Sequence, residues 1–208
     1  MLDKLTAKYP DLEPCLPDLQ RTFEILTACY EQGGKVLICG NGGSASDSEH
    51  LVGELMKGYL APRPVPDAMR QRLNEMYPDL GEYLADHLQG ALPTISLVSQ
   101  TALMTAFIND VAADMVFAQQ VYGYGVEGDA LIGISTSGNS GNVLHALRVA
   151  RAKGVRTIGI TGQSGGAMLD LCDVTLRVPF RDTTDVQERH LAIYHTLCAM
   201  LEARFFPA

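Results

Sequence analysis

Short, almost continuously apolar runs alternate with helical patterns along this chain, and this alternation most limits the folds open to it. Such runs span residues 35–39, 94–98, 130–134, 155–160 and 173–178. Strands that are apolar throughout are typical of parallel sheets with both faces covered by helices. We therefore predict an α/β fold built on a parallel sheet.

The segments between these runs carry helical patterns. Residues 16–32 place apolar side chains at steps of three and four, and Gly33-Gly34 ends that helix. Ser44 or Ser46 is a candidate cap for a helix that runs to about residue 59. We expect one domain over residues 1–208, with a helical segment at 1–33, a helical insertion at 61–90 and a C-terminal helix at 186–205.

Charge and cysteine content exclude several classes of protein. A formal net charge of -8 provides no general attraction to nucleic-acid phosphates. The five cysteines are odd in number and contain no C-x-x-C pair, which argues against a disulfide framework and a thiolate zinc site. We see no apolar signal-peptide core and no apolar stretch of about 18 residues, so we expect a cytoplasmic protein without a membrane partner.

The first predicted strand ends in a glycine-rich turn, Gly40-Asn41-Gly42-Gly43-Ser44-Ala45. This turn matches the relaxed dinucleotide fingerprint G-x-G-x-x-A. That site needs a second strand ending in an acidic residue about 20 residues later, and a proline-rich segment lies there instead. The alternatives are a turn whose amides face an anion at a helix N-terminus and a plain strand–helix turn.

A row of hydroxyl groups follows the strand at 130–134. Its members are Ser135, Thr136, Ser137 and Ser140, with Gly138 and Asn139 between them. Hydroxyls and free amides at the start of a helix can bind a phosphate dianion. A helix cap by Ser137 or Asn139 explains one such residue but not four. We therefore favour a phosphate-binding loop at the carboxyl end of this strand.

Three segments together resemble a known family: CGNGGSASDSEHLVGEL, GDALIGISTSGNSGNV and DVQERHLAIYH. They are similar to the SIS (sugar isomerase) domain and, within it, to the bacterial phosphoheptose isomerases. The resemblance covers most of residues 15–205 and implies a doubly wound, five-stranded parallel sheet in three α/β/α layers. It also implies a homotetramer with active sites built from neighbouring subunits.

The resemblance further implies which residues bind and react. The implied substrate contacts are Asn41, Gly42, Ser44, Glu54, Asn109, Asp110, Ser135, Thr136, Ser137, Ser140 and Gln187. The implied ligands of one zinc or other divalent ion per subunit are His50, Glu54, Gln187 and His195. Glu54 and His195 are the implied acid–base pair for isomerisation of sedoheptulose 7-phosphate to D-glycero-D-manno-heptose 7-phosphate through an enediol.

The spacing of these residues supports part of this assignment. His50 and Glu54 lie four residues apart, hence on one helix face, and both suit a divalent ion, although a surface pair has the same spacing. Gln187 and His195 lie about 80° apart around a helix, so spacing alone leaves His190 as good a candidate as His195.

Three departures from the family pattern bear on which sugar is the substrate. Residues 61–90 lengthen a connection, Gly58 stands where a basic residue is common, and Gln100 replaces an aspartate. Lys57 and Arg63 flank Gly58. The alternative to an enzyme is a non-enzymatic SIS protein of the replication-initiator-binding type, but all four ligand positions are filled here. A sugar-phosphate-sensing regulator is a third class, and no segment is basic enough for its DNA-binding domain.

Overall fold

The computed structural model describes residues 1–207 and confirms the predicted α/β fold. One parallel sheet has the strand order β2-β1-β3-β4-β5. The strands are β1 (Val36–Gly40), β2 (Thr94–Ser96), β3 (Ala130–Ile134), β4 (Arg156–Thr161) and β5 (Val174–Arg177). The order reverses between β1 and β3, which makes the sheet doubly wound.

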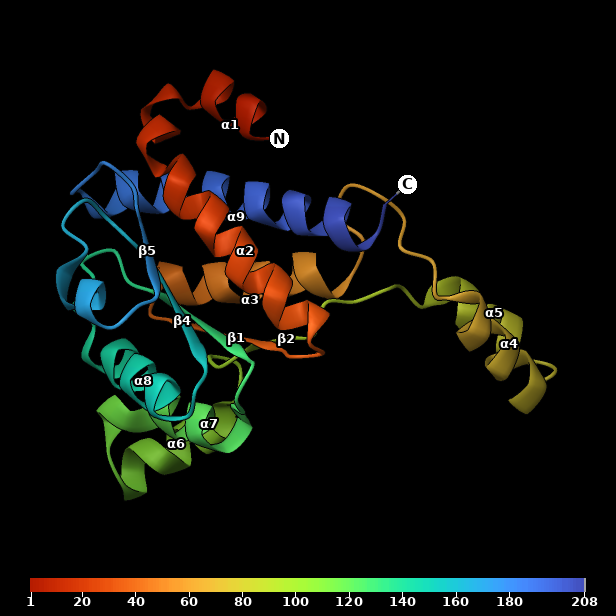
Figure 1. Cartoon of the computed structure of the whole chain (residues 1–208). Coiled ribbons are helices and arrows are strands. Elements are labelled where there is room, and N and C mark those ends of the chain that lie inside the picture. Colours follow the sequence, from red (N-terminus) through yellow and green to blue (C-terminus); the bar gives the residue numbers. More distant parts are fainter. Residues whose placement is uncertain (208) are drawn as a thin grey trace.

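Helices cover the two faces of this sheet, giving three layers (Figure 1). One face carries α2 (Leu16–Glu31), α3 (Gly43–Met56) and α9 (Thr183–Phe205). The other face carries α7 (Val116–Tyr124) and α8 (Gly141–Ala152). Neighbouring residues of a strand therefore enter different cores: Ile38 packs towards α3 and α9, and Leu37 packs towards α7 and α8.

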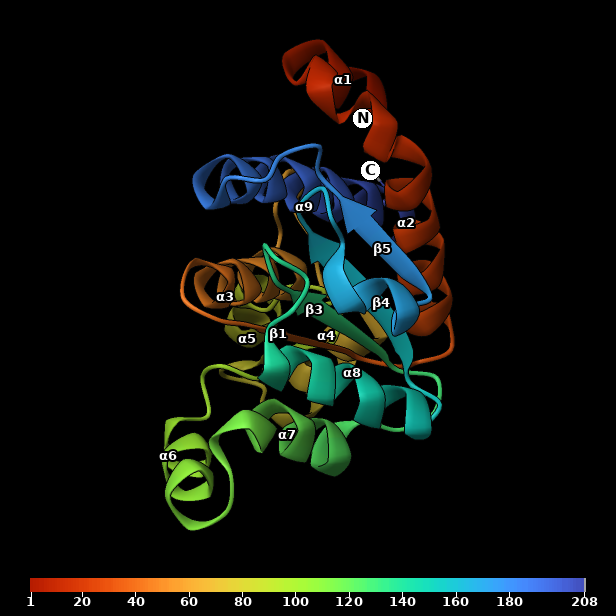
Figure 2. The same ribbon diagram turned by 90° about the vertical axis from the view of Figure 1, so that its left-hand side faces the viewer.

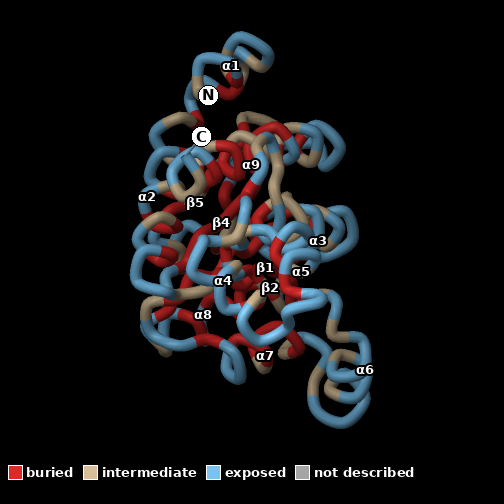
Figure 3. The backbone as a smooth tube through the Cα atoms, turned by 90° about the vertical axis from the view of Figure 1, so that its right-hand side faces the viewer, coloured by how far each residue is buried: buried red, intermediate tan, exposed pale blue. Residues whose placement is uncertain are grey.

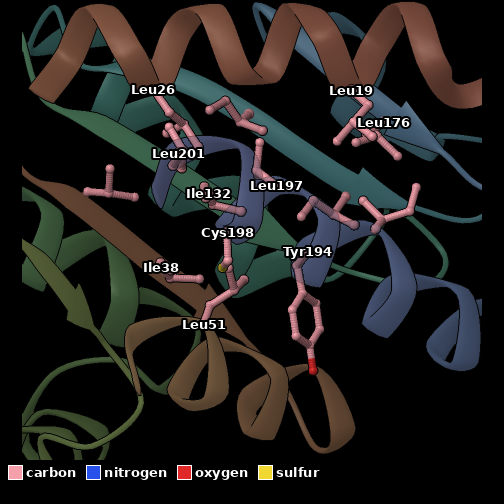
Figure 4. Close-up of a cluster of buried hydrophobic side chains, with 14 of the residues drawn as sticks. Leu19, Leu26, Ile38, Leu51, Ile132, Leu176, Tyr194, Leu197, Cys198 and Leu201 are labelled. Atoms are coloured by element: carbon pink, nitrogen blue, oxygen red, sulfur yellow. The ribbon is translucent and has the colours of Figure 1, made fainter. Parts of the chain in front are cut away.

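The core between the sheet and α9 fixes the helices that carry the predicted ligands. Figure 4 shows Leu51 of α3 and Leu197 of α9 beside Ile38 and Ile132 of the sheet. All four are fully buried, and each such side chain contributes about 1.5–3 kcal/mol to folding. Buried positions follow the strands and the inner faces of these helices (Figure 3). The relative position of α3 and α9 is thus set by a tight apolar contact.

Three peripheral parts complete the chain. At the N-terminus, α1 (Leu2–Lys8) and the short helical turn η1 (Pro10–Cys15) lead into α2. Helix α6 (Thr101–Asp110) contains no buried residue and stands out at one end of the molecule (Figure 2). Two further turns, η2 (Ala113–Met115) and η3 (Gly166–Asp170), precede α7 and β5.

The helical insertion predicted at residues 61–90 forms two helices. These are α4 (Asp67–Met76) and α5 (Gly81–His87), which pack as a hairpin beside the body (Figure 1). Pro78 separates the two helices because it lacks an amide N–H and disfavours a helical conformation at Tyr77. The hairpin joins the body through a narrow neck, where Pro64 and Gln89 form an antiparallel bridge.

Two predicted helix starts differ from those observed. Neither Ser44 nor Ser46 caps α3; Gly42 takes that position with a φ of 55°, a conformation that favours glycine. Both serines instead lie within the first turn of the helix. The C-terminal helix begins at Thr183, earlier than predicted, because the Asp182 carboxylate accepts a hydrogen bond from the Thr184 amide.

None of the helices in residues 1–207 has the length and apolar character needed to cross a membrane.

Candidate active site

The two loops predicted to bind phosphate lie side by side where the strand order reverses. They follow β1 and β3, which are neighbours in the sheet. Asn41 and Asn142 join them through two amide hydrogen bonds of 2.9 Å, one in each direction. In open α/β sheets, ligands bind at this switch point beyond the carboxyl ends of the strands.

A hydrogen bond and a close backbone contact fix the conformation of the hydroxyl loop after β3. Ser135 is buried, and its Oγ lies 2.9 Å from Oγ of Ser140. Gly138 has a φ of 69° and passes so close to Gly165 that a Cβ atom there would lie 2.0 Å from the Gly165 carbonyl oxygen. Only glycine fits this approach. The loop is therefore fixed before any ligand arrives.

Neither Ser137 nor Asn139 caps the helix that follows. Ser140 is the residue before α8, and the Asn139 amide group instead donates to Ser137 O and accepts from Ala167 N. The Ser137 Oγ accepts a 3.2 Å hydrogen bond from the backbone N–H of Asn139. The hydroxyl hydrogen of Ser137 is therefore free to donate. The capping alternative is wrong for both residues.

A pocket of about 410 Å³ opens beside this loop. Its lining includes Thr136 and Ser137 from the loop and Arg181 from the segment before α9. Arg181 is exposed and donates to Gln163 Oε1 at 2.8 Å. We did not anticipate this arginine, because it lies far from the loop in sequence and no local motif marks it.

The glycine turn after β1 contacts α9 through Gln187. A Cβ atom at Gly43 would lie 2.4 Å from Nε2 of Gln187, so the amide group rests directly on this turn. Ser44 is buried at the same turn, and Asn41 and Gly42 are exposed. After α3 the chain runs through the insertion to the edge strand β2, so the acidic strand end of a dinucleotide site is absent from the described residues.

Three of the predicted reactive residues meet between α3 and α9. The Nε2 atom of His50 lies 3.4 Å from Oε1 of Glu54 and 3.3 Å from Nε2 of His195. Partial burial lowers the pKa of His195 and the neighbouring His50 adds to this, whereas Glu54 opposes it. We call His50, Glu54 and His195 the histidine–glutamate cluster.

The two histidines that spacing could not separate have different environments. His195 belongs to the cluster, and the Tyr59 ring stacks on it at 5.6 Å. His190 is fully buried, and neither of its ring nitrogens has a hydrogen-bond partner among the described residues. Burial lowers the pKa of His190 to about 4, with the Thr161 backbone acting in the opposite direction. The structure thus brings His195, rather than His190, to His50.

The cluster has the ligand types of a zinc site, and two of its distances can be compared with one. Two imidazoles and a carboxylate are a known catalytic zinc set, with bonds of about 2.0–2.2 Å. Ligands on a tetrahedron of that size lie about 3.3–3.6 Å apart, and the two distances at His50 fall in this range. Over residues 1–207, however, no group of three or more His, Cys, Asp or Glu side chains is arranged so that it could hold a metal ion.

The remaining predicted contacts lie elsewhere in the chain. Asn109 and Asp110 end α6, where the Asn109 amide donates to the Asp110 carboxylate at 2.8 Å. Gln100 immediately precedes this helix. Helix α6 lies at the opposite side of the sheet from α9 (Figure 2). Within one chain, therefore, these residues are not brought to the cluster.

The basic residues beside Gly58 have separate roles. Lys57 is exposed and its Nζ lies 3.4 Å from Oε2 of Glu54. Arg63 is buried and donates to the backbone oxygens of Glu54 at 3.1 Å and Leu55 at 2.8 Å. Its Nε donates to Glu202 of α9 at 2.9 Å. Arg63 therefore joins the end of α3 to α9 directly beneath the cluster.

Glu202 completes this support. Its carboxylate accepts hydrogen bonds from the backbone amides of Tyr59, Leu60 and Ala61. Burial by itself raises the pKa of Glu202, but the bonds from Tyr59, Leu60 and Arg63 outweigh it and lower the pKa. The same bonds hold the segment that carries Tyr59 against His195.

Comparison with known proteins identifies the family. The SIS domain model matches residues 72–162. The phosphoheptose isomerase of Rhodospirillum rubrum is 39% identical over 191 residues, covering 92% of this chain and 88% of that protein. The phosphoheptose isomerase of Aliarcobacter butzleri is also 39% identical, covering 92% of this chain and 87% of that protein.

Solved structures agree with these relatives. The phosphoheptose isomerase of Neisseria gonorrhoeae superposes with a TM-score of 0.75 at 30% identity, covering 97% of this chain and 94% of that one. The enzyme from Francisella tularensis gives a TM-score of 0.71 at 30% identity, covering 97% and 98%. The chain therefore belongs to the phosphoheptose isomerase family of SIS-domain proteins, and it is a sugar-phosphate isomerase.

Proposed function

We propose that this enzyme interconverts sedoheptulose 7-phosphate and D-glycero-D-manno-heptose 7-phosphate. The observation that carries the proposal is the hydroxyl loop after β3 together with the histidine–glutamate cluster between α3, which follows β1, and α9. The loop suits the phosphate and the cluster suits the carbonyl end of the sugar. Relatives named phosphoheptose isomerase support the choice of a seven-carbon substrate.

The phosphate end binds without chemical change. The hydroxyls of Thr136 and Ser137, one hydroxyl of the bonded Ser135–Ser140 pair, and the amides at the start of α8 donate to the phosphate oxygens. These donors are already ordered, so less conformational entropy is lost when the ligand binds. Arg181, at the rim of the same pocket, adds positive charge beside a dianion.

The cluster end moves the proton. Glu54 accepts a proton from the carbon beside the carbonyl and returns it to the neighbouring carbon, through an enediol. His195 exchanges a proton with the sugar oxygens, for which a partly buried imidazole near its neutral form is suited. Either residue can take the first proton, and Glu54 is the one held by a neighbour on each side, His50 and Lys57.

His50, Glu54, Gln187 and His195 would hold one divalent metal, for which zinc fits the ligand types. When bound, such an ion polarises a carbonyl and stabilises negative charge on its oxygen. The ligand types and the two distances at His50 support this assignment. Gln187 lies beside the glycine turn, where it can serve either the metal or the sugar.

We further propose a homotetramer whose neighbouring subunits complete each site. Helix α6 exposes Leu103 and Ile108, and Val111 is exposed directly after it; all three would be covered in an interface. Such packing would bring Asn109 and Asp110 to the substrate of another subunit. The cytoplasm stays the predicted location, in keeping with five cysteines that form no disulfide.

The test is an isomerase assay on a panel of ketose phosphates, combined with metal analysis of the purified protein. We expect conversion of sedoheptulose 7-phosphate and close to one equivalent of divalent metal per chain. Preference for a five- or six-carbon ketose phosphate would overturn the choice of substrate. Full activity in protein stripped of metal would overturn the metal assignment.

A further inference from the structure

Tyr194 contacts the Nδ1 atom of His50, and Asp47 contacts Tyr194 in turn. The Tyr194 hydroxyl lies 3.0 Å from Nδ1 of His50 and 3.2 Å from Oδ1 of Asp47. Asp47 lies one helical turn before His50 on α3, and Tyr194 precedes His195 on α9. Figure 4 shows the Tyr194 ring reaching from α9 towards α3 with its oxygen at the far end.

The number of protons available determines how these groups are bonded. A tyrosine hydroxyl has one hydrogen, and an ionised carboxylate can only accept. The Tyr194 hydrogen is therefore donated to Asp47. The hydroxyl oxygen can then bond to His50 only by accepting, so the ring hydrogen of His50 must be on Nδ1.

This tautomer leaves Nε2 of His50 with a lone pair. That lone pair faces the Glu54 carboxylate at 3.4 Å and Nε2 of His195 at 3.3 Å. Two electron-rich atoms, the imidazole nitrogen and the carboxylate oxygen, then lie close together with no hydrogen between them. A cation relieves this repulsion, and a neutral imidazole with a free Nε2 is what a metal ion binds.

The arrangement costs stability, which argues against a purely structural role. Tyr194 is 1% exposed, and Oδ2 of Asp47 is buried with no hydrogen-bond partner among the described residues. A phenylalanine at position 194 with an apolar residue at position 47 would fill the same space without a buried carboxylate. The polar groups are thus explained by what they do to His50.

We propose that Asp47 and Tyr194 are positioning residues that fix the tautomer and ring orientation of His50 for metal binding. The proposal rests on the proposed function of the cluster, because it assumes that His50 is a ligand. Neither residue touches the reacting atoms. Their effect passes through the hydrogen bond to Nδ1.

The test uses histidine labelled with ¹⁵N in metal-free protein at about pH 8, where an ordinary imidazole is neutral. In the wild type, long-range ¹H–¹⁵N correlations should show His50 with its hydrogen on Nδ1. Tyr194→Phe should convert His50 to a mixture of tautomers. Competition with a chelator should show that Tyr194→Phe weakens Zn²⁺ binding by about 10–100-fold. This is the usual effect of removing a hydrogen bond that orients a metal ligand.

Tyr30→Phe is the matched control. Tyr30 is also buried, and its hydroxyl lies 2.8 Å from Oγ1 of Thr94, away from the cluster. This variant should change stability but neither the tautomer nor Zn²⁺ affinity. Wild-type His50 protonated on Nε2, or unchanged tautomer and Zn²⁺ affinity in Tyr194→Phe, would overturn the inference. A wild type with the Nδ1–H tautomer that neither binds Zn²⁺ nor isomerises would instead contradict the proposed function.

Discussion

At the cluster end of the site, His50, Glu54 and His195 can all gain or lose a proton, whereas the loop from Ser135 to Ser140 contains no charged side chain. The cluster depends on contacts between two helices that are distant in sequence. The loop depends on one strand end and a close approach of two glycines. Under the proposed function, the chemistry belongs to one end and most of the ligand affinity to the other, so substitutions at the two ends should have separable effects.

The largest effect should come from Glu54→Gln. An amide keeps the shape of the carboxylate but cannot accept the proton, so the turnover rate should fall by about 10²–10⁴-fold. Thermal stabilisation by the substrate should survive, because we propose that the phosphate binds at the other end. Metal content must be measured in the same samples.

Glu49→Gln is the control for that variant. Glu49 lies on the same helix and is exposed, with its carboxylate accepting a bond from Ser99. It should turn over substrate normally. An active Glu54→Gln enzyme that retains its metal would transfer the role of the base to His195.

Arg63→Met should give the next largest effect, on stability. This change leaves the Glu202 carboxylate without its cationic partner beneath the cluster. Breaking a buried pair by removing one member costs about 3–5 kcal/mol. Urea unfolding should show this loss in the free energy of unfolding.

The matched change Arg70→Met removes an arginine that bonds to Glu82 and Asp86 on the insertion hairpin. Those partners are exposed, and such pairs contribute about 0–1 kcal/mol. Equal losses from Arg63→Met and Arg70→Met would show that the cluster does not depend on its buried support.

Ser137→Ala should act on affinity rather than on turnover. Losing one hydrogen bond to a charged phosphate costs about 1.5–3 kcal/mol, which weakens binding by roughly 10–150-fold. Calorimetry with sedoheptulose 7-phosphate measures this change. Ser137→Thr retains the hydroxyl and should recover most of the affinity. A drop in turnover with unchanged affinity would contradict the division between the two ends.

The smallest effect at neutral pH should come from His190→Leu. The pKa of His190 is lowered to about 4 in the folded protein, whereas its value in the unfolded chain is about 6.5. At a pH below about 6.5, the unfolded state therefore binds more protons than the folded state. Wild-type stability should therefore fall as the pH drops from about 6.5 towards 4. His190→Leu should lose this part of the pH dependence and stay active. If His190→Leu abolishes activity and His195→Ala does not, the roles of the two histidines are reversed.

Local sequence patterns predicted the fold and the hydroxyl loop well. Apolar strands, the glycine turn and the row of hydroxyls are properties of consecutive residues, and parallel strand ends converge at one edge of a sheet. His50 and Glu54 share a helix face for the same kind of reason. The position of Asp47 on the same helix face could have been predicted in the same way, because it lies three residues before His50.

The supporting residues depended on tertiary contacts that no spacing reveals. Tyr194 matters because of the face that α9 turns towards α3, and Glu202 because the chain after α3 folds back over α9. Choosing between His190 and His195 needed the same information. The break at Pro78 between α4 and α5 is different, because proline chemistry predicts it from the sequence.

The neck of the insertion fixes where the chain leaves and re-enters the body. Besides the Pro64–Gln89 bridge, the Gly90 amide donates to Arg63 O, and the Gly58 amide donates to the Gln89 side chain. With both ends tied together, doubling the length of the appendage adds only about 0.6 kcal/mol of loop-closure entropy. The α4–α5 hairpin is consequently a suitable insertion site. A reporter or affinity module should be able to replace it with little change in the stability of the body.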